Sequence, residues 1–169
     1  MLFQVTKDDG SLIARHATRD DADAVERLYT LLSPENRSIS VQPDRLDLIA
    51  NDPANLLLVV EWKGNVIGTA LLTICLDAMF GTQPFGVVEN IIVDTDYRST
   101  GCGRFVSDAI DRAALNADSS KVMLLSNHMR SDAHAYFEAM GYDGEVKRGF
   151  VKYRSRLEAA SVHSVLRPA

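Results

Sequence analysis

The residues best suited to chemistry lie between Val87 and Arg104, in the stretch VVENIIVDTDYRSTGCGR. Its β-branched run predicts a strand over Val87–Val93, and apolar side chains at helical spacing follow Gly103. A helix that begins after a glycine-bearing loop presents unpaired backbone N–H groups and the positive end of its dipole. Because Arg98 and Arg104 flank the loop, we expect it to bind an anion such as a phosphate.

Two other phosphate-binding motifs do not fit this loop. A P-loop requires Lys and then Ser or Thr after its last glycine, and a dinucleotide fingerprint requires a third glycine. Gly101 and Gly103 satisfy neither pattern. A plain turn before a helix would give the same spacing, so the two glycines alone do not establish a site.

The elements that must position this loop alternate between strands and helices. Runs rich in apolar and β-branched residues predict strands at residues 12–17, 56–62, 66–75, 87–93, 121–125 and 150–154. Apolar residues at helical spacing predict helices at residues 18–32, 43–50, 104–117 and 133–140. Local signals agree: Thr18 and Asp21 form a near capping box, residues 63–65 form a hairpin turn, and Gly141 ends the last helix. The order predicts a mixed α/β domain.

Length and composition exclude several protein classes. The 169 residues, 46% hydrophobic and 24% charged, fit one globular domain rather than a disordered or low-complexity chain. The apolar runs are far shorter than the roughly 20 residues of a membrane helix, so we expect no membrane span. The first ten residues show no secretory signal, and Cys75 and Cys102 fit free thiols in a reducing compartment. We therefore expect a cytoplasmic protein.

The charge distribution bears on possible partners. The net charge of −5 argues against a general nucleic-acid binder, because neutralising phosphates requires a basic surface. The charge is −8 before Arg98 and +3 from Arg98 onward. The second part of the chain could therefore accommodate an anionic ligand, although such a split also arises by chance on solvated faces.

The loop RSTGCG at residues 98–103, placed after IIVD at residues 91–94, resembles the cofactor loop of the GNAT family of N-acetyltransferases. That loop reads Gln or Arg-x-x-Gly-x-Gly or Ala. The turn at residues 18–21 and the segment AHAYFEAMGY at residues 133–142 are similar to the opening turn and the last helix of the family. The resemblance covers about residues 11–154. It implies a single domain over residues 1–169 whose core is residues 11–154. The tail at residues 156–169 shows no convincing pattern.

The fold implied by the resemblance is a mixed, mostly antiparallel central sheet with helices on both faces and two strands that splay apart at the cofactor site. The activity implied is transfer of the acetyl group of acetyl-CoA to a primary amine of a small molecule by direct attack. The cofactor-binding positions implied are Ile91, Ile92, Val93, Arg98, Ser99, Thr100, Gly101, Cys102, Gly103, Arg104, Arg130 and Phe137. No metal site is expected, because His128 and His134 lack matching ligand residues.

Glu89 is the candidate base, because an ammonium has no lone pair and must lose a proton before it attacks a thioester. Strand alternation predicts that Glu89 shares a face with Ile91 and Val93 and points away from Asn90 and Ile92. The alternative is a carboxylate that pairs with a neighbouring arginine or binds the substrate cation without moving a proton.

Two positions depart from the family pattern. Phe137 stands where the family usually has the tyrosine that protonates the leaving thiolate, so neighbouring Tyr136 becomes the candidate acid; the alternative is that these rings are core. Arg130 stands where the family has an asparagine that touches the pantetheine. It could pair with a cofactor phosphate or an anionic substrate, or simply be solvated.

The acceptor class rests on analogy. The run SNHMRSDAH at residues 126–134, together with the pair Glu89-Asn90, resembles family members that acetylate small amines such as aminoalkylphosphonates or phosphorylated amino sugars. Two alternatives stay open: a protein or peptide N-acetyltransferase, and a non-catalytic acyl-CoA-binding sensor. Homodimers are common in the family, and the residues do not decide whether this chain forms one.

Overall fold

The structure is a computed structural model that describes residues 3–98 and 100–158. It divides into two compact units, residues 1–125 and 126–169. Within the described residues, no helix combines the length and the apolar character that crossing a membrane requires.

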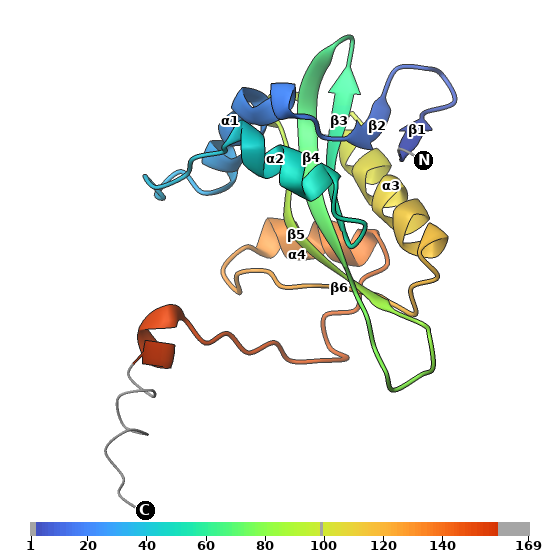
Figure 1. Cartoon of the computed structure of the whole chain (residues 1–169). Helices are drawn as coiled ribbons and strands as arrows, with labels where there is room; N and C mark the ends of the chain where they lie inside the picture. Colours follow the sequence, from blue (N-terminus) through green and yellow to red (C-terminus); the bar gives the residue numbers. More distant parts are fainter. Residues whose placement is uncertain (1–2, 99, 159–169) are drawn as a thin grey trace, which may run out of the picture. The chain divides into compact units, whose positions relative to one another are not determined.

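The first unit is built on a six-stranded sheet whose strands lie in sequence order (Figure 1). The strands are β1 Gln4–Thr6, β2 Ile13–His16, β3 Asn55–Trp62, β4 Asn65–Cys75, β5 Phe85–Val93 and β6 Val122–Leu124. The first five pair antiparallel, and β6 pairs parallel with β5. The expected mixed, mostly antiparallel sheet is confirmed. Strand β1 was not expected, and its Val5 belongs to the core.

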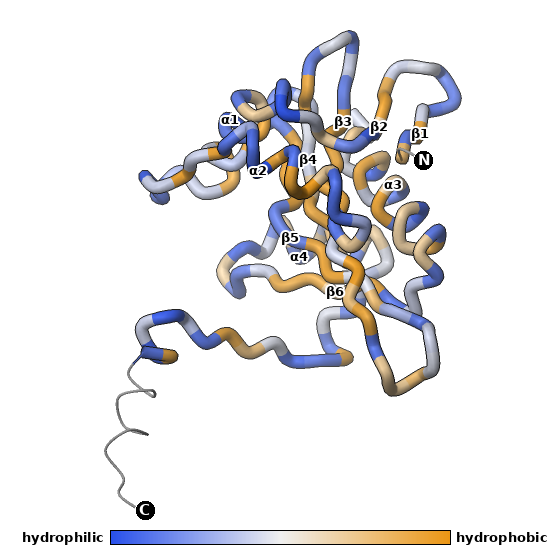
Figure 2. Tube along the Cα trace, viewed as in Figure 1, coloured by the Kyte–Doolittle hydropathy of each residue, from blue (hydrophilic) through white to orange (hydrophobic). Residues whose placement is uncertain are grey.

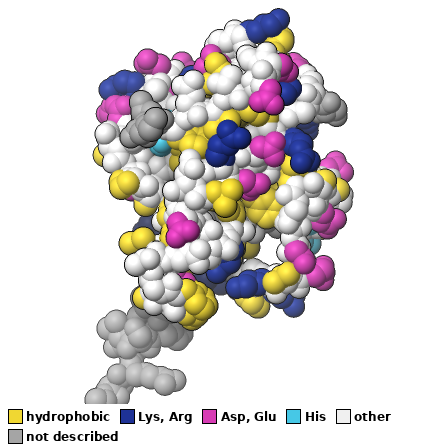
Figure 3. Space-filling model, turned by 90° about the vertical axis from the view of Figure 1, so that its right-hand side faces the viewer, with side chains coloured by type: hydrophobic (Ala, Val, Ile, Leu, Met, Phe, Trp, Pro, Cys, Tyr) yellow, Lys and Arg dark blue, Asp and Glu magenta, His cyan; other side chains and the backbone are white. Residues whose placement is uncertain are grey.

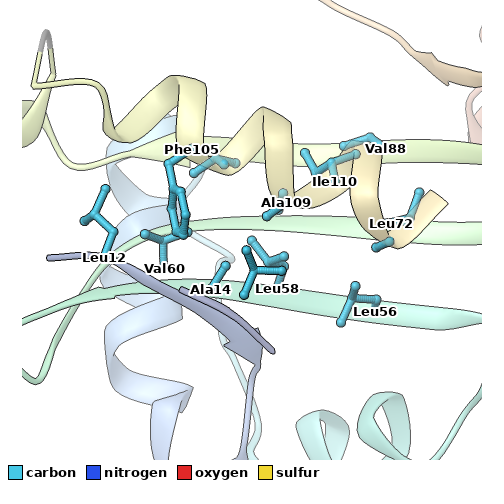
Figure 4. Packing of buried hydrophobic residues seen from close by; sticks show 14 of the residues in the cluster. Leu12, Ala14, Leu56, Leu58, Val60, Leu72, Val88, Phe105, Ala109 and Ile110 are labelled. Atoms are coloured by element: carbon cyan, nitrogen blue, oxygen red, sulfur yellow. The ribbon is translucent and has the colours of Figure 1, made fainter. Parts of the chain in front are cut away.

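Helices cover both faces of this sheet. Helices α1 (Ala22–Leu32) and α2 (Pro43–Ala50) lie over one face, and α3 (Cys102–Asn116) lies over the other. In β3, Leu57 and Val59 pack toward α1 and α2, whereas Leu58 and Val60 pack toward α3 (Figure 4). This alternation explains the unbroken apolar run at residues 56–60 of β3. Figure 2 shows hydrophobic segments, in orange, gathered in the strands of the sheet.

Local sequence signals set the ends of these elements. The Asp21 carboxylate accepts hydrogen bonds from the Thr18 N–H at 2.7 Å and the Thr18 hydroxyl at 3.0 Å, which confirms the capping box. A short 3₁₀ turn, Arg19–Asp21, then leads into α1. Lys63 and Gly64 both have positive φ, +50° and +80°, as a tight hairpin turn between β3 and β4 requires.

The second unit contains helix α4, Ser131–Ala139. Gly141, at φ +91°, follows its end, and the Gly141 and Tyr142 N–H groups donate to the Glu138 and Phe137 carbonyls. This is the Schellman pattern of helix termination, so the C-terminal role expected for Gly141 is confirmed.

The strand expected at residues 150–154 is wrong. Residues 150–153 have no regular structure, and residues 154–158 are helical. Phe150 and Tyr153 are 86% and 73% exposed. A β-rich run makes a strand only when a neighbouring strand pairs with it, and no described strand pairs with residues 150–154. Of the tail, residues 159–169 lie outside the described residues.

Candidate active site

One edge of β5 extends beyond its parallel partner. The pairing with β6 includes Gly86, Val87 and Val88 and ends at the pair Val88–Leu124. Strand β5 itself continues to Val93, held on its other side by β4. In the described residues, β5 thus has a backbone edge beyond the end of β6 that no strand pairs with. The strands expected to splay apart at the cofactor site would leave such an edge.

The backbone groups at that edge belong to alternate residues. The Asp94 N–H donates to the Ile67 carbonyl of β4 at 2.8 Å, and Ile92 stands opposite Thr69. Because N–H groups along a strand alternate between its two edges, those of Ile91 and Val93 point to the edge away from β4. Of the three expected backbone contacts, Ile91 and Val93 therefore face the open edge, whereas Ile92 faces β4.

A bulge interrupts β5 next to Glu89. Glu89 pairs with Leu71 and Ile92 pairs with Thr69, so Asn90 and Ile91 together oppose the single residue Ala70. Asn90 has φ +56°, in the left-handed region that asparagine tolerates better than most residues.

The bulge overturns the expected facing of Glu89. Across the sheet, Leu71 packs with the core under α1 and α2, so its partner Glu89 points to that side. Ile92 packs on the same side, whereas Ile91 and Val93 pack toward α3. Glu89 therefore shares a face with Ile92 and not with Ile91 and Val93, because the extra residue shifts the alternation by one.

Glu89 is exposed beside a polar pair that the sequence did not suggest. The Asn90 side chain acts on the Tyr29 hydroxyl of α1 and lowers its pKa, which places Asn90 toward α1 as well. Burial raises the pKa of Tyr29, so its hydroxyl stays protonated at neutral pH. The face of the bulge under α1 thus carries a carboxylate, an amide and a phenol.

The donor loop, residues 94–104, comprises the connection from β5 to α3 and the first residues of α3, Cys102–Arg104. Gly101 caps α3 at φ +88°, and a Cβ added there would meet nothing within 4 Å. The first turn of α3 contains no acidic residue and includes the exposed Arg104. Arg98, also exposed, donates from Nε to the Val93 carbonyl at 3.4 Å. An open, positively charged helix N-terminus fits the anion site expected from the sequence. Ser99 lies outside the described residues.

Cys102 contributes to this loop through its backbone. The side chain is fully buried in the core, and burial raises the pKa of its thiol to about 11. A thiol in this state is a poor nucleophile. Both Cys102 and Cys75 are free, as expected.

The remaining expected residues belong to the second unit. Phe137 provides the carbonyl that accepts the Tyr142 N–H, and its ring packs against Tyr142 at 5.9 Å between centroids, the apolar contact that accompanies a Schellman motif. The Tyr136 ring lies 5.3 Å from the Phe137 ring. Arg130 is exposed at the N-cap of α4, where its carbonyl accepts the His134 N–H.

The first unit thus brings together the β5 edge, the bulge and the donor loop, while Arg130, Tyr136 and Phe137 lie in the second unit. On the face drawn in Figure 3, acidic and basic side chains are interspersed. The sequence reasoning missed Tyr29 and Arg27, which α1 contributes near the bulge and the donor loop. Neither residue is part of a local motif.

Comparison with known families decides the assignment. The family model described as the acetyltransferase (GNAT) family matches residues 22–142, well over half of the chain. The chain belongs to the GNAT acetyltransferase family. The match runs from α1 to the end of the Schellman motif and so includes the bulge, the donor loop and α4. No curated protein sequence matches this acetyltransferase.

Solved structures share its fold. A protein from Agrobacterium tumefaciens str. C58 described as a candidate acetyltransferase is 27% identical, with a TM-score of 0.75 over 83% of this chain and 99% of that chain. Glucosamine-6-phosphate N-acetyltransferase from Arabidopsis thaliana is 18% identical, with a TM-score of 0.69 over 85% and 99%. Aminoglycoside N-acetyltransferase AAC(6')-Iy in complex with CoA is 17% identical, with a TM-score of 0.71 over 85% and 95%. The last two support the acetyltransferase fold alone.

Proposed function

We propose that this acetyltransferase transfers the acetyl group of acetyl-CoA to a primary amine of a small molecule by direct attack, as one domain in the cytoplasm. The observation that carries the proposal is the continuity of two features in the first unit. The backbone edge of β5 beyond β6 is followed, after the 3₁₀ turn Thr95–Tyr97, by the Gly101-capped N-terminus of α3. An edge that can pair with an amide-bearing arm, followed by an anion site, suits a long ligand such as CoA.

The residues present fit acetyl-CoA. Gly101 leaves open space in front of the first turn of α3, and that turn holds no carboxylate to repel a phosphate. The backbone of residues 99–104, with the Arg98 and Arg104 side chains, would hold the pyrophosphate. The Val93 N–H group would donate to the pantetheine arm. Acetyl-CoA supplies the thioester carbonyl and the thiolate leaving group.

The β5 backbone near the bulge would also stabilise the reaction. Attack by an amine on a thioester places negative charge on the carbonyl oxygen. A backbone N–H that is already fixed in a strand can donate to this oxygen without reorganising, which lowers the barrier. Ile91 is the second residue of the bulge, and its N–H is the proposed donor.

Glu89 would prepare the acceptor. Its carboxylate points to the α1 side of the sheet, where Asn90 and Tyr29 add hydrogen-bonding groups for a polar amine. The carboxylate would bind the ammonium form and accept its proton, directly or through water. Binding of the cation without proton transfer remains the alternative role.

Departure of the thiolate requires little general-acid catalysis. A thiol with a pKa near about 8.5 is already an adequate leaving group, so Phe137 in place of a tyrosine is compatible with turnover. Tyr136 is retained as the proposed acid, and Phe137 as an apolar contact for the cofactor as well as for Tyr142. Arg130 would meet a cofactor phosphate or an anionic group on the substrate.

Small amines are the favoured acceptors. Proteins with this fold include aminoglycoside and glucosamine-6-phosphate N-acetyltransferases, whose acceptors are amino sugars. For this chain, a phosphorylated or phosphonate-bearing amine would suit the charge of +3 from Arg98 onward.

The test is release of free CoA thiol from acetyl-CoA across a panel of aminophosphonates, amino sugars and their phosphates, polyamines, amino acids and lysine peptides. Release with a small amine, matched by an N-acetylated product, supports the proposal. Release with lysine peptides alone would instead identify a peptide acetyltransferase. Tight acetyl-CoA binding with no amine-dependent release across the panel would favour a sensor.

A further inference from the structure

Arg27 connects α1 to two segments of the sheet. Its Nη1 atom donates to Oδ2 of Asp94, where β5 ends, and its Nη2 atom donates to the Val66 carbonyl of β4 at 3.1 Å. A planar guanidinium can hold two such acceptors in a fixed geometry. One side chain therefore ties the end of β5 to the beginning of β4.

Asp94 is also hydrogen-bonded to the turn that follows it. Its second carboxylate oxygen accepts the Asp96 N–H at 3.2 Å, and its carbonyl accepts the Tyr97 N–H at 3.0 Å. These bonds shape the 3₁₀ turn Thr95–Tyr97. The Thr100 hydroxyl then donates to the Tyr97 carbonyl at 2.6 Å, next to Gly101. A continuous series of hydrogen bonds thus runs from Arg27 to the N-terminus of α3.

The Asp94 carboxylate depends on Arg27 for its place. The Asp94 side chain is 12% exposed, whereas that of Arg27 is 48% exposed. A carboxylate with so little solvent contact is unfavourable unless a cation or several donors compensate it. Loss of the guanidinium would favour rotation of Asp94 toward water, which would release the Asp96 N–H and loosen the turn.

We propose that Arg27 is a positioning residue of the donor loop: through Asp94, it sets the geometry in which the N-terminus of α3 binds the pyrophosphate of CoA. This inference rests on the proposed function, because it takes CoA as the ligand of the loop. Arg27 acts through Asp94, so its loss should weaken donor binding rather than slow the acyl-transfer step.

The experiment compares the Arg27→Gln variant with the wild type for two ligands. Calorimetry measures the Kd of CoA, and a thiol-release assay measures kcat/KM for acetyl-pantetheine, a donor without phosphates. We expect the Kd of CoA to rise about tenfold, the lower end of the loss that metal sites show when a residue that orients a ligand is removed. The kcat/KM for acetyl-pantetheine should stay at the wild-type value, which a general loss of structure would not allow.

Two further variants complete the design. Arg19→Gln is the matched control, because Arg19 also pairs with aspartates, Asp44 and Asp47, but on the α2 side. Its CoA affinity should equal that of the wild type. Asp94→Asn preserves size and an acceptor for Asp96 while removing the charge that pairs with Arg27. It should weaken CoA binding, and adding Arg27→Gln should then have less effect than in the wild-type background.

The outcomes separate this inference from the proposed function. Wild-type protein that binds CoA, with an unchanged Kd in Arg27→Gln, would overturn the role of Arg27 alone. Equal losses in CoA affinity and in kcat/KM for acetyl-pantetheine would show a general structural effect and would also overturn the role of Arg27. If Arg27→Gln does not fold, the Kd of CoA and the kcat/KM for acetyl-pantetheine of the Asp94→Asn variant provide the same test. Wild-type protein that does not bind CoA would overturn the proposed function first and this inference with it.

Discussion

The Gly101→Ala variant tests the donor site most sharply, because backbone strain and ligand contact can be separated. Gly101 has φ +88°, and an L side chain in the left-handed region costs about 1 kcal/mol. The added Cβ meets no atom within 4 Å, so no clash adds to this cost. We expect the free energy of unfolding to fall by about 1 kcal/mol, measured by urea denaturation.

The effect of Gly101→Ala on CoA affinity should be larger. The methyl group would occupy the space through which a phosphate reaches the first turn of α3. Loss of two charge-assisted hydrogen bonds at about 1.5 kcal/mol each amounts to about 3 kcal/mol. This corresponds to an increase of about 100-fold in the Kd of CoA, measured by calorimetry.

Gly64→Ala is the matched control for this experiment. Gly64 also has positive φ, +80°, and open space around its Cβ, but it lies in the β3–β4 hairpin turn. We expect the same loss of stability and no change in the Kd of CoA. If Gly101→Ala binds CoA as tightly as Gly64→Ala does, the pyrophosphate does not lie against this turn and the reasoning is refuted.

Three further predictions concern stability and catalysis. Burial alone would raise the pKa of Asp21, but hydrogen bonds from Arg15 and Thr18 outweigh it and lower the pKa. The Arg15–Asp21 ion pair therefore stabilises the fold above about pH 4, and this stabilisation is lost in acid. Asp21→Asn should cost about 3 kcal/mol in urea denaturation at pH 7, and the cost should decrease as the pH falls below the pKa of an unperturbed aspartate. A cost that does not change with pH would contradict this interpretation. Glu89→Gln should lower kcat about 100-fold, chiefly at lower pH where amines are protonated, so an unchanged pH–rate profile would exclude Glu89 as the base. Tyr136→Phe should lower kcat about tenfold without changing the Kd of CoA if Tyr136 is the acid, and an unaltered kcat would leave the thiolate to depart unaided.

Much of the fold follows from local signals in the sequence. The capping box at Thr18 and Asp21, the Lys63-Gly64 turn and the Gly141 terminus depend on the backbone preferences of a few neighbouring residues. The sequence carries such preferences directly, and these elements were predicted. The strand at residues 150–154 was not a local matter, because a strand forms only with a partner.

The candidate site could be predicted only in part for the same reason. Gly101 and the two arginines marked the donor loop, since a helix N-terminus acts through backbone that a short motif reveals. The bulge at Asn90 depends on the register between β4 and β5, and one extra residue there reversed the facing predicted for Glu89. Arg27 contacts Asp94 only after α1 packs on the sheet, so no spacing in the sequence indicates the pair.

The central claim is that CoA lies along the free edge of β5 and against the N-terminus of α3. Amide resonances of a ¹⁵N-labelled protein of 18.6 kDa, recorded with and without CoA, test this residue by residue. We expect shifts and slower hydrogen exchange at Ile91, Val93 and the donor loop, with little change at Ile92, whose N–H already faces β4. Shifts confined to other parts of the chain, or none at saturating CoA, would contradict it.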